Sequence, residues 1–169
     1  GYAGIAALTT IVRYLPSAEI TLVDPNTHHV KITHLHETFR YPLSDFLIPF
    51  HDIEQKFGCH HLCLKLSFNE STLLQWEQKK CITTQNESLP FDYLLIASGA
   101  PTNLSIQGSD NVIGLPSLLR ESGSEILHQF LSKHNAEEPI SIVGAGATGI
   151  QFLFEIEHFL RCHKYKNKL

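Results

Sequence analysis

The glycines of residues 144–149 have the spacing needed to bind a nucleotide phosphate. Gly144, Gly146 and Gly149 form a G-x-G-x-x-G pattern that follows the β-favouring residues 140–143 and precedes an apolar helical pattern. In such a pattern the middle glycine lets the backbone approach a pyrophosphate, and the helix that follows offers N-terminal amides and a favourable dipole. The spacing predicts a dinucleotide-binding turn; an ordinary glycine-rich turn between a strand and a helix is the alternative.

The start of the chain carries the second half of the same pattern. Gly1 and Gly4 are spaced as its last two glycines, and an apolar helical segment follows them. A nucleotide-binding turn of this kind is followed about 20 residues later by an acid, which ends the next strand and binds a ribose hydroxyl. Asp24 ends the β-favouring run 18–24 and meets that requirement. We therefore predict a second nucleotide site here, with an ordinary helix entry as the alternative.

The segment 58–63, Gly-Cys-His-His-Leu-Cys, is another place where reactive side chains gather. Cys59, Cys63 and the two histidines between them are possible zinc ligands, but a structural zinc site needs a second, separated ligand pair and none is evident. The thiols are alternatively a redox-active pair or two unrelated buried thiols. We predict unrelated thiols and no metal site. The other histidines of the first half are predicted to be surface or hydrogen-bonded residues: His28, His29, His34, His36 and His51.

The elements that must hold these residues follow from the hydrophobic pattern. Helices are predicted at 3–14, 117–134 and 147–162, where apolar residues recur at helical spacing. Strands are predicted at 18–24, 61–68, 72–78, 80–85, 91–101 and 139–143. The three strands between 61 and 85 are expected to form a meander, and 91–101 is expected to be buried on both faces of a sheet. The His-rich, Pro-interrupted segment 25–57 is expected to be a connection with short helical pieces. Together these elements predict an α/β fold with a parallel sheet, helices and a β-meander.

Composition excludes several functional classes. The 169 residues are 43% hydrophobic and 18% charged with a net charge of -4, which is typical of a soluble globular protein and gives no bulk attraction to nucleic acid or an anionic membrane. No apolar run is long enough to cross a membrane, and no signal peptide is evident. Four cysteines without a dense pattern predict reduced thiols and a cytoplasmic setting. The initial glycine and the absence of methionine indicate a truncated chain or methionines that were not recorded.

The two glycine patterns lie about 140 residues apart with FDYLLIASGA between them. This order resembles that of the FAD/NAD(P)-dependent pyridine nucleotide-disulfide oxidoreductase superfamily. Within it, ITLVDPNTHHVKITHLHETF and SIVGAGATGIQFLFEIEHF are similar to segments of type II NADH dehydrogenases (NADH:quinone oxidoreductases) and of sulfide:quinone oxidoreductases. The resemblance implies a Rossmann-like FAD-binding domain at 1–110, without its first strand. It also implies a linker helix and the first β-α unit of an NAD(P)H-binding domain at 111–169.

The resemblance also implies roles for individual residues. The residues implied for FAD are Gly1, Tyr2, Ala3, Gly4, Asp24, Pro25, Ala97, Ser98 and Gly99. Those implied for NAD(P)H are Gly144, Ala145, Gly146, Ala147, Thr148 and Gly149. Gln151 stands where the family usually has Glu, Glu155 matches a common helix acid, and Thr33 and His34 fall in the segment that runs by the flavin. No side chain is expected to act as a nucleophile or general base, because the flavin carries the chemistry.

The implied function is an FAD-dependent oxidoreductase that passes a hydride from NAD(P)H to flavin and electrons on to a quinone-like acceptor. The alternatives are a truncated or degenerate flavoprotein half with a binding or scaffold role, and a single-domain NAD(P)-binding reductase, which would have one glycine turn. The expected partners are a nicotinamide nucleotide and a small-molecule acceptor, without nucleic acid. The sequence does not decide whether the protein forms a homodimer. It also does not decide whether the full-length parent attaches peripherally to the inner face of a membrane.

Overall fold

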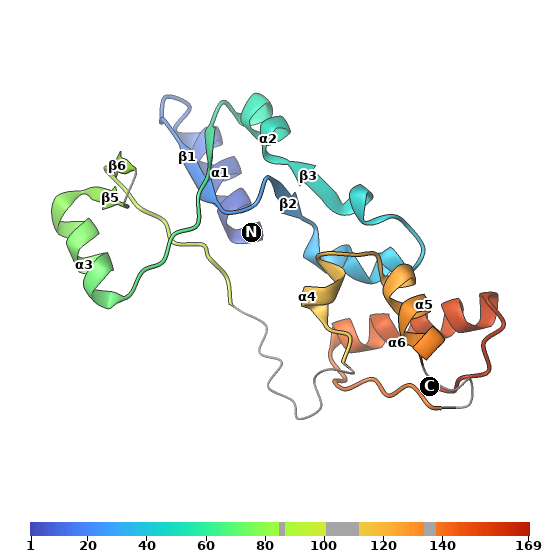
Figure 1. The fold of residues 1–169 in the computed structure, drawn as a ribbon. Coiled ribbons are helices and arrows are strands. Elements are labelled where there is room, and N and C mark those ends of the chain that lie inside the picture. Colours follow the sequence, from blue (N-terminus) through green and yellow to red (C-terminus); the bar gives the residue numbers. More distant parts are fainter. Residues whose placement is uncertain (85–86, 101–111, 134–137) are drawn as a thin grey trace. The chain divides into compact units, whose positions relative to one another are not determined.

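The computed structural model describes residues 1–84, 87–100, 112–133 and 138–169 and is drawn in Figure 1. The chain divides into two compact units. Unit 1 comprises Gly1–His29 and Ile48–Ala100, and unit 2 comprises Val30–Leu47 and Pro101–Leu169. The predicted domain boundary between residues 110 and 111 lies outside the described residues and stays a prediction.

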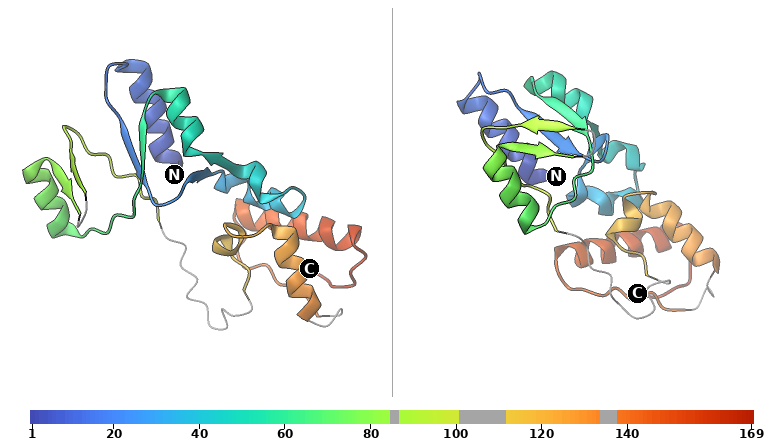
Figure 2. Two further views of the ribbon diagram at one scale, coloured as in Figure 1. Left: turned by 45° about the horizontal axis from the view of Figure 1, so that its top comes forward. Right: turned by 60° about the vertical axis from the view of Figure 1, so that its left-hand side comes forward.

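Unit 1 contains a short parallel sheet and a separate antiparallel one. Strand β1 pairs in parallel with β4, and β5 pairs with β6 in antiparallel orientation, as Figure 2 shows. In chain order, the elements of this unit are α1 (Tyr2–Tyr14), β1 (Thr21–Asp24), α2 (Phe50–Phe57), β4 (His60–Cys63), α3 (Glu70–Lys79), β5 (Cys81–Thr83) and β6 (Ser88–Pro90). A further two-stranded sheet joins β2 (His28–Val30) to β3 (Leu47–Pro49), and the division between the units falls within these two strands.

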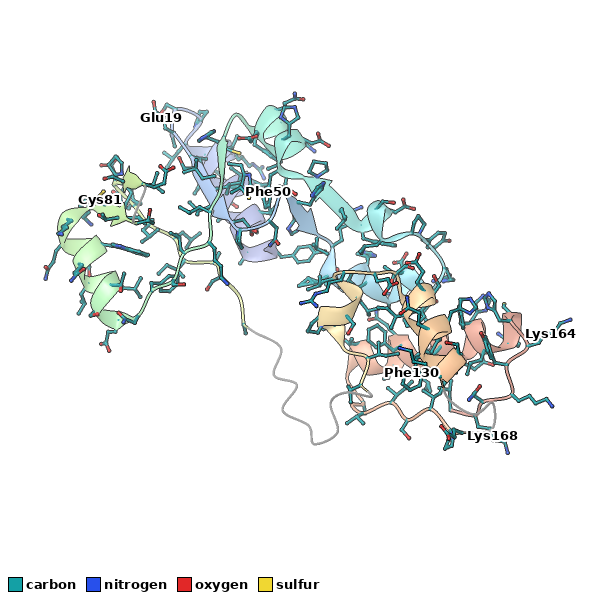
Figure 3. The ribbon with its side chains drawn as sticks, in the orientation of Figure 1. Glu19, Phe50, Cys81, Phe130, Lys164 and Lys168 are labelled. Atoms are coloured by element: carbon teal, nitrogen blue, oxygen red, sulfur yellow. The ribbon has the colours of Figure 1, made fainter. Side chains whose placement is uncertain are left out.

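The core of unit 1 forms where α1 meets α2. Leu8, Phe50 and Ile53 are each at most 5% exposed and pack together. Figure 3 draws the side chains of this region and labels Phe50. The helix predicted at 3–14 is confirmed, and it ends before Pro16, as expected because proline cannot continue a helix.

Segment 72–78, predicted as a strand of the meander, is instead part of helix α3. The side chain of Asn69 accepts a hydrogen bond of 2.9 Å from the backbone N–H of Thr72, which caps the helix and favours it over a strand. Trp76 of the same helix is buried at 5% exposure. Within the part of the chain that the structure describes, the predicted meander is therefore represented by the antiparallel pair β5–β6 alone.

The strand predicted at 91–101 is also wrong over its described part, residues 91–100. No regular element forms there, and Tyr93 and Leu95 are 96% and 63% exposed. A strand buried on both faces needs hydrogen-bonding neighbours along its edges and packing layers on both sides. The backbone N–H of Phe91 donates to the carbonyl oxygen of Lys80 at 2.9 Å, but no described strand pairs with this segment, so it lacks the ladder of hydrogen bonds that would make it a strand. Residue 101 lies outside the described residues.

Unit 2 consists of helices around one apolar core. The 3-10 helix η1 contacts both α5 and α6, and the three lie together in Figure 1. The buried residues of this core are Phe39, Leu127, Leu131, Ile156, Phe159 and Leu160. In chain order, the helices of unit 2 are η1 (Ile32–Phe39), η2 (Leu43–Phe46), α4 (Leu115–Leu118), α5 (Gly123–Lys133) and α6 (Ala147–Cys162).

Of the sequence predictions for unit 2, one helix is confirmed, the other is confirmed only in part, and the strand is wrong. The helix at 147–162 is confirmed with the same bounds, whereas the helix at 117–134 divides into α4 and α5, and its last residue lies outside the described part. Residues 139–143 form no strand, and Val143 is 83% exposed. As at 91–100, no described strand pairs with this segment. Among the described residues, no helix combines the length and the apolarity needed to cross a bilayer.

Candidate functional site

The first glycine turn and its acid lie together in unit 1. Gly1 stands directly before α1, and its backbone nitrogen lies 3.9 Å from Oδ2 of Asp24 at the end of β1. The other carboxylate oxygen, Oδ1, accepts hydrogen bonds of 2.9 Å from both the backbone N–H and the side-chain amide of Asn26. The carboxylate is therefore held in a fixed position beside the N-terminus of a helix, where anionic ligands bind well.

The segment with the implied flavin residues 97–99 reaches the same turn. A Cβ built on Gly4 would lie 3.6 Å from the Cβ of Ala97, so the side chain of Ala97 lies beside Gly4. Ala97 is half-buried, and Ser98 and Gly99 are exposed. Three segments distant in sequence thus meet at the N-terminus of α1. The roles of these residues in binding, and that of the exposed Pro25, stay predictions.

His29, predicted to be a surface or hydrogen-bonded residue, is buried beside the first turn. It is 5% exposed, and its ring lies edge-on to that of Tyr2 with the centroids 5.0 Å apart. Burial lowers the pKa of His29, and the charge of Asp24 opposes this effect. The ring is therefore kept neutral. Within the short strand β2, His29 is buried between the half-buried His28 and Val30, and nothing in the sequence distinguishes it from the neighbouring histidine.

The second turn has a backbone that only glycine can form at two of its positions. Gly144 has a φ of +117°, in the region that side chains disfavour, and a Cβ on Gly149 would overlap the carbonyl oxygen of Gly144. A Cβ on Gly146 would meet nothing within 4 Å. Gly146 therefore faces open space directly before α6, and the N-terminal amides of that helix are accessible to a ligand.

A cavity of about 200 Å³ opens beside the first two turns of α6 in unit 2. One wall comes from η1 and α4 and the other from α6, and each wall contributes both polar and apolar side chains. The lining residues are Ile32, Thr33, His36, Leu115, Ala147, Thr148, Gln151 and Phe152. Two residues of the predicted phosphate turn and one of the predicted flavin segment thus line one space. A volume of this size accommodates a single ring of a ligand rather than a whole dinucleotide.

His34, the other residue of the predicted flavin segment, does not line this cavity. Its Nδ1 lies 2.7 Å from Oε1 of Glu37, and its side chain is 52% exposed. The hydrogen bond from His34 lowers the pKa of Glu37. Glu37 is therefore an anion near neutral pH, one residue away from the cavity-lining His36.

The cysteine and histidine side chains of 59–63 have separate partners. Cys59 is half-buried, and burial raises the pKa of its thiol, which disfavours the reactive thiolate. Cys63 lies 3.5 Å from the carbonyl oxygen of Pro25, and both cysteines are free thiols. The ring of His61 stacks on that of Phe50 at 4.1 Å. Across the described ranges, no three His, Cys, Asp or Glu side chains are grouped as metal ligands.

Comparison with known proteins gives a consistent result. The family model described as pyridine nucleotide-disulphide oxidoreductase matches residues 1–161. Type II NADH:quinone oxidoreductases of Staphylococcus aureus strains NCTC 8325 / PS 47 and COL are each 31% identical to this chain over 183 aligned positions, which cover 98% of this chain and 44% of theirs. The chain therefore spans less than half the length of these curated relatives.

Among solved structures, the sulfide:quinone oxidoreductase of the bacterium Aquifex aeolicus is similar in fold. Its TM-score is 0.71 at 17% sequence identity, and the match covers 96% of this chain and 38% of that one. At this identity the likeness shows the fold alone. It confirms the predicted Rossmann-like α/β class.

Proposed function

The chain belongs to the pyridine nucleotide-disulphide oxidoreductase family, and on that premise we propose that it is part of an FAD-dependent oxidoreductase. The proposed reaction passes a hydride from NAD(P)H to the flavin and electrons on to a quinone-like acceptor. The names of the relatives, NADH:quinone and sulfide:quinone oxidoreductase, support this choice of acceptor. When bound, the flavin supplies the hydride and electron chemistry, and the residues of this chain bind and orient the flavin and the nucleotide.

The first turn is proposed to hold the FAD. The N-terminal amides of α1 would donate hydrogen bonds to the pyrophosphate, and the carboxylate of Asp24 would accept them from the adenosine ribose. The distance of 3.9 Å between Gly1 N and Asp24 Oδ2 supports this pairing of turn and acid. Ala97, Ser98 and Gly99 would lie along the phosphates or the ribityl chain.

The second turn is proposed to hold NAD(P)H. The backbone of Gly144–Gly149 fits a phosphate, because Gly146 leaves open space before α6 and Gly149 permits the tight turn. Ala147 and Thr148 lie at the helix N-terminus and also line the cavity of unit 2. On this proposal residues 1–110 form the FAD-binding domain, and 111–169 form the linker helix and the start of the NAD(P)H-binding domain.

The observation that carries the proposal is the joint occurrence of two glycine turns at helix N-termini, with Asp24 beside the first. It is tested by purifying the chain with added FAD and recording its visible absorption before and after addition of NADH without oxygen. Flavin bands that bleach with NADH are the expected result. A colourless protein that does not oxidise NADH would show that this chain has no such activity.

A non-catalytic flavoprotein half is the second candidate function. Gln151 favours it, because this residue lines the cavity where the family usually has a Glu. The same experiment separates the two functions. Bound flavin that NADH does not bleach, while dithionite does, would support a binding or scaffold role, since the flavin would then be intact but cut off from the nucleotide.

On the same basis we propose a cytoplasmic setting, with peripheral attachment of the full-length protein at the inner face of a membrane. Fractionation of cells that express the full reading frame tests this. Recovery in a membrane fraction that high salt or alkali strips would support peripheral attachment, and recovery in the soluble fraction alone would contradict it.

A further inference from the structure

Three consecutive residues dock the end of η1 onto the helices of unit 2. The hydroxyl oxygen of Thr38, which is fully buried, accepts a hydrogen bond of 2.9 Å from the backbone N–H of Gly123 at the start of α5. Phe39 meets Phe152 of α6 edge-on, with ring centroids 6.0 Å apart. The next residue, Arg40, provides the polar contact to α6.

Arg40 and Glu155 form a close ion pair across 115 positions of sequence. Nη2 of Arg40 donates to Oε1 of Glu155 at 2.7 Å. The two partners differ in exposure, since the Glu155 side chain is 11% exposed and the Arg40 side chain is 44% exposed. The carboxylate has therefore lost most of its water and depends on the guanidinium, whereas the guanidinium keeps much of its hydration.

The pair stands at the end of both walls of the unit 2 cavity. Thr33 and His36 of one wall lie on η1, which Arg40 directly follows, and Gln151 of the other wall lies one helical turn before Glu155 on α6. Side chains four residues apart on a helix share a face, so Gln151 and Glu155 lie on the same side of α6. The ion pair between Arg40 and Glu155 therefore also fixes the distance between the wall that η1 forms and the wall that α6 forms.

We propose that Arg40 and Glu155 are a positioning pair that holds the first two turns of α6 against η1 and so sets the cavity beside the second glycine turn. One consequence of this inference rests on the proposed function: the pair strengthens binding of a nicotinamide nucleotide at Gly144–Gly149. Its other consequence, that α6 is locally held, concerns the chain itself.

The test compares Arg40→Gln, Glu155→Gln and the exchanged pair Arg40→Glu with Glu155→Arg in the whole chain. Arg161→Gln and Glu157→Gln are matched controls, because these two residues form an ion pair of 3.4 Å on the same helix with side chains 69% and 51% exposed. Two quantities are measured: the dissociation constant for NADH, by fluorescence titration, and amide hydrogen exchange in residues 147–152 and 123–133.

Arg40→Gln is expected to weaken NADH binding by about tenfold, because it leaves a carboxylate that is only 11% exposed without its partner. Glu155→Gln should weaken it by less, since it leaves an exposed guanidinium in water. Exchange should rise in 147–152 and stay unchanged in α5. The exchanged pair should recover most of both losses, and the controls should change binding by less than about twofold.

The outcomes separate this inference from the proposed function. If the unmodified chain does not bind NADH, nucleotide binding fails for this chain, and hydrogen exchange alone then decides the positioning role. Unchanged exchange in 147–152 with Arg40→Gln would overturn the inference, and so would an equal rise in α5, which indicates a general structural role. If Arg40→Gln does not fold, an exchanged pair with native helix content but raised exchange in 147–152 overturns it equally.

Discussion

Two glycines of the second turn, Gly146 and Gly149, have different physical roles although they are the same residue type. Gly149 is required by the fold, because a Cβ there would overlap the carbonyl oxygen of Gly144. The fold does not require Gly146, because a Cβ there would meet open space. The absence of a side chain at Gly146 instead leaves room for a ligand to approach the backbone. His29 differs from most histidines, because its ring is buried against that of Tyr2 and its pKa is lowered, so the ring is neutral.

Substitution of the two glycines should therefore separate folding from binding. Gly149→Ala is expected to destabilise the chain by about 1–3 kcal/mol, as overpacking against backbone does. Gly146→Ala should change stability by less than about 0.5 kcal/mol, because its Cβ has room. It should nevertheless weaken NADH binding about tenfold, because the methyl group occupies the path of the pyrophosphate. Urea unfolding and NADH titration measure the two effects, and equal stability of both variants would contradict the assignment.

The neutral state of His29 makes stability depend on pH in a defined direction. The pKa of the folded ring is lowered from its usual value of 6.5, so the unfolded chain binds a proton that the folded chain does not. Stability should therefore fall as the pH drops below about 6.5, and His29→Gln should remove this part of the slope. Urea midpoints between pH 5 and pH 8 measure it. His51→Gln, at an exposed histidine, is the control and should keep the slope.

At the scale of elements, whether a segment forms a helix depends mainly on its own sequence, whereas whether it forms a strand depends on pairing with another segment. α1 and α6 form where their own sequences favour helices, whereas α3, most of which was predicted as a strand, is a helix that the side chain of Asn69 caps. The runs 91–100 and 139–143 have strand-like composition but form no strand, because a strand takes its hydrogen bonds from a neighbour and no described strand lies beside them. The helices α1 and α6 could therefore be predicted from the sequence, whereas α3 and the two strand-like runs could not.

The cap of α3 can be tested by itself. Asn69→Ala should destabilise α3 by about 1 kcal/mol, because Oδ1 accepts from the backbone N–H of Thr72 and from its hydroxyl, both at 2.9 Å. Asn69→Asp keeps an acceptor in place and is the control. Hydrogen exchange in Glu70–Lys79 should rise in the first variant and not in the second. Equal exchange in both would show that the cap does not hold this helix.

At the scale of the whole molecule, the two units are each built from segments that are not contiguous in sequence. Val30–Leu47 packs in unit 2, although the residues before and after it belong to unit 1. Its docking depends on Gly123, because a Cβ there would lie 2.8 Å from Cδ2 of Phe39. The core of unit 1 around Leu8 shares no buried residue with the core of unit 2.

Gly123→Ala should therefore disturb unit 2 selectively. It is expected to cost about 1–3 kcal/mol, because the ring of Phe39 must move away from a well-packed position. Hydrogen exchange should rise in α5 and α6 and stay unchanged in α1. Ser132→Ala, at an exposed position of the same helix, is the control. A rise in α1 equal to that in α6 would show that the two units are not stabilised independently.

The sequence by itself determined the two glycine turns, the acid after the first turn, and the helices that follow both turns. These features depend on residues within about 20 positions of one another, where spacing and backbone preference act directly. Only the tertiary structure decided that His29 is buried, that Ala97 reaches Gly4 and that Arg40 pairs with Glu155. These contacts join residues far apart in the chain, and burial and charge pairing depend on packing that periodicity in the sequence does not encode.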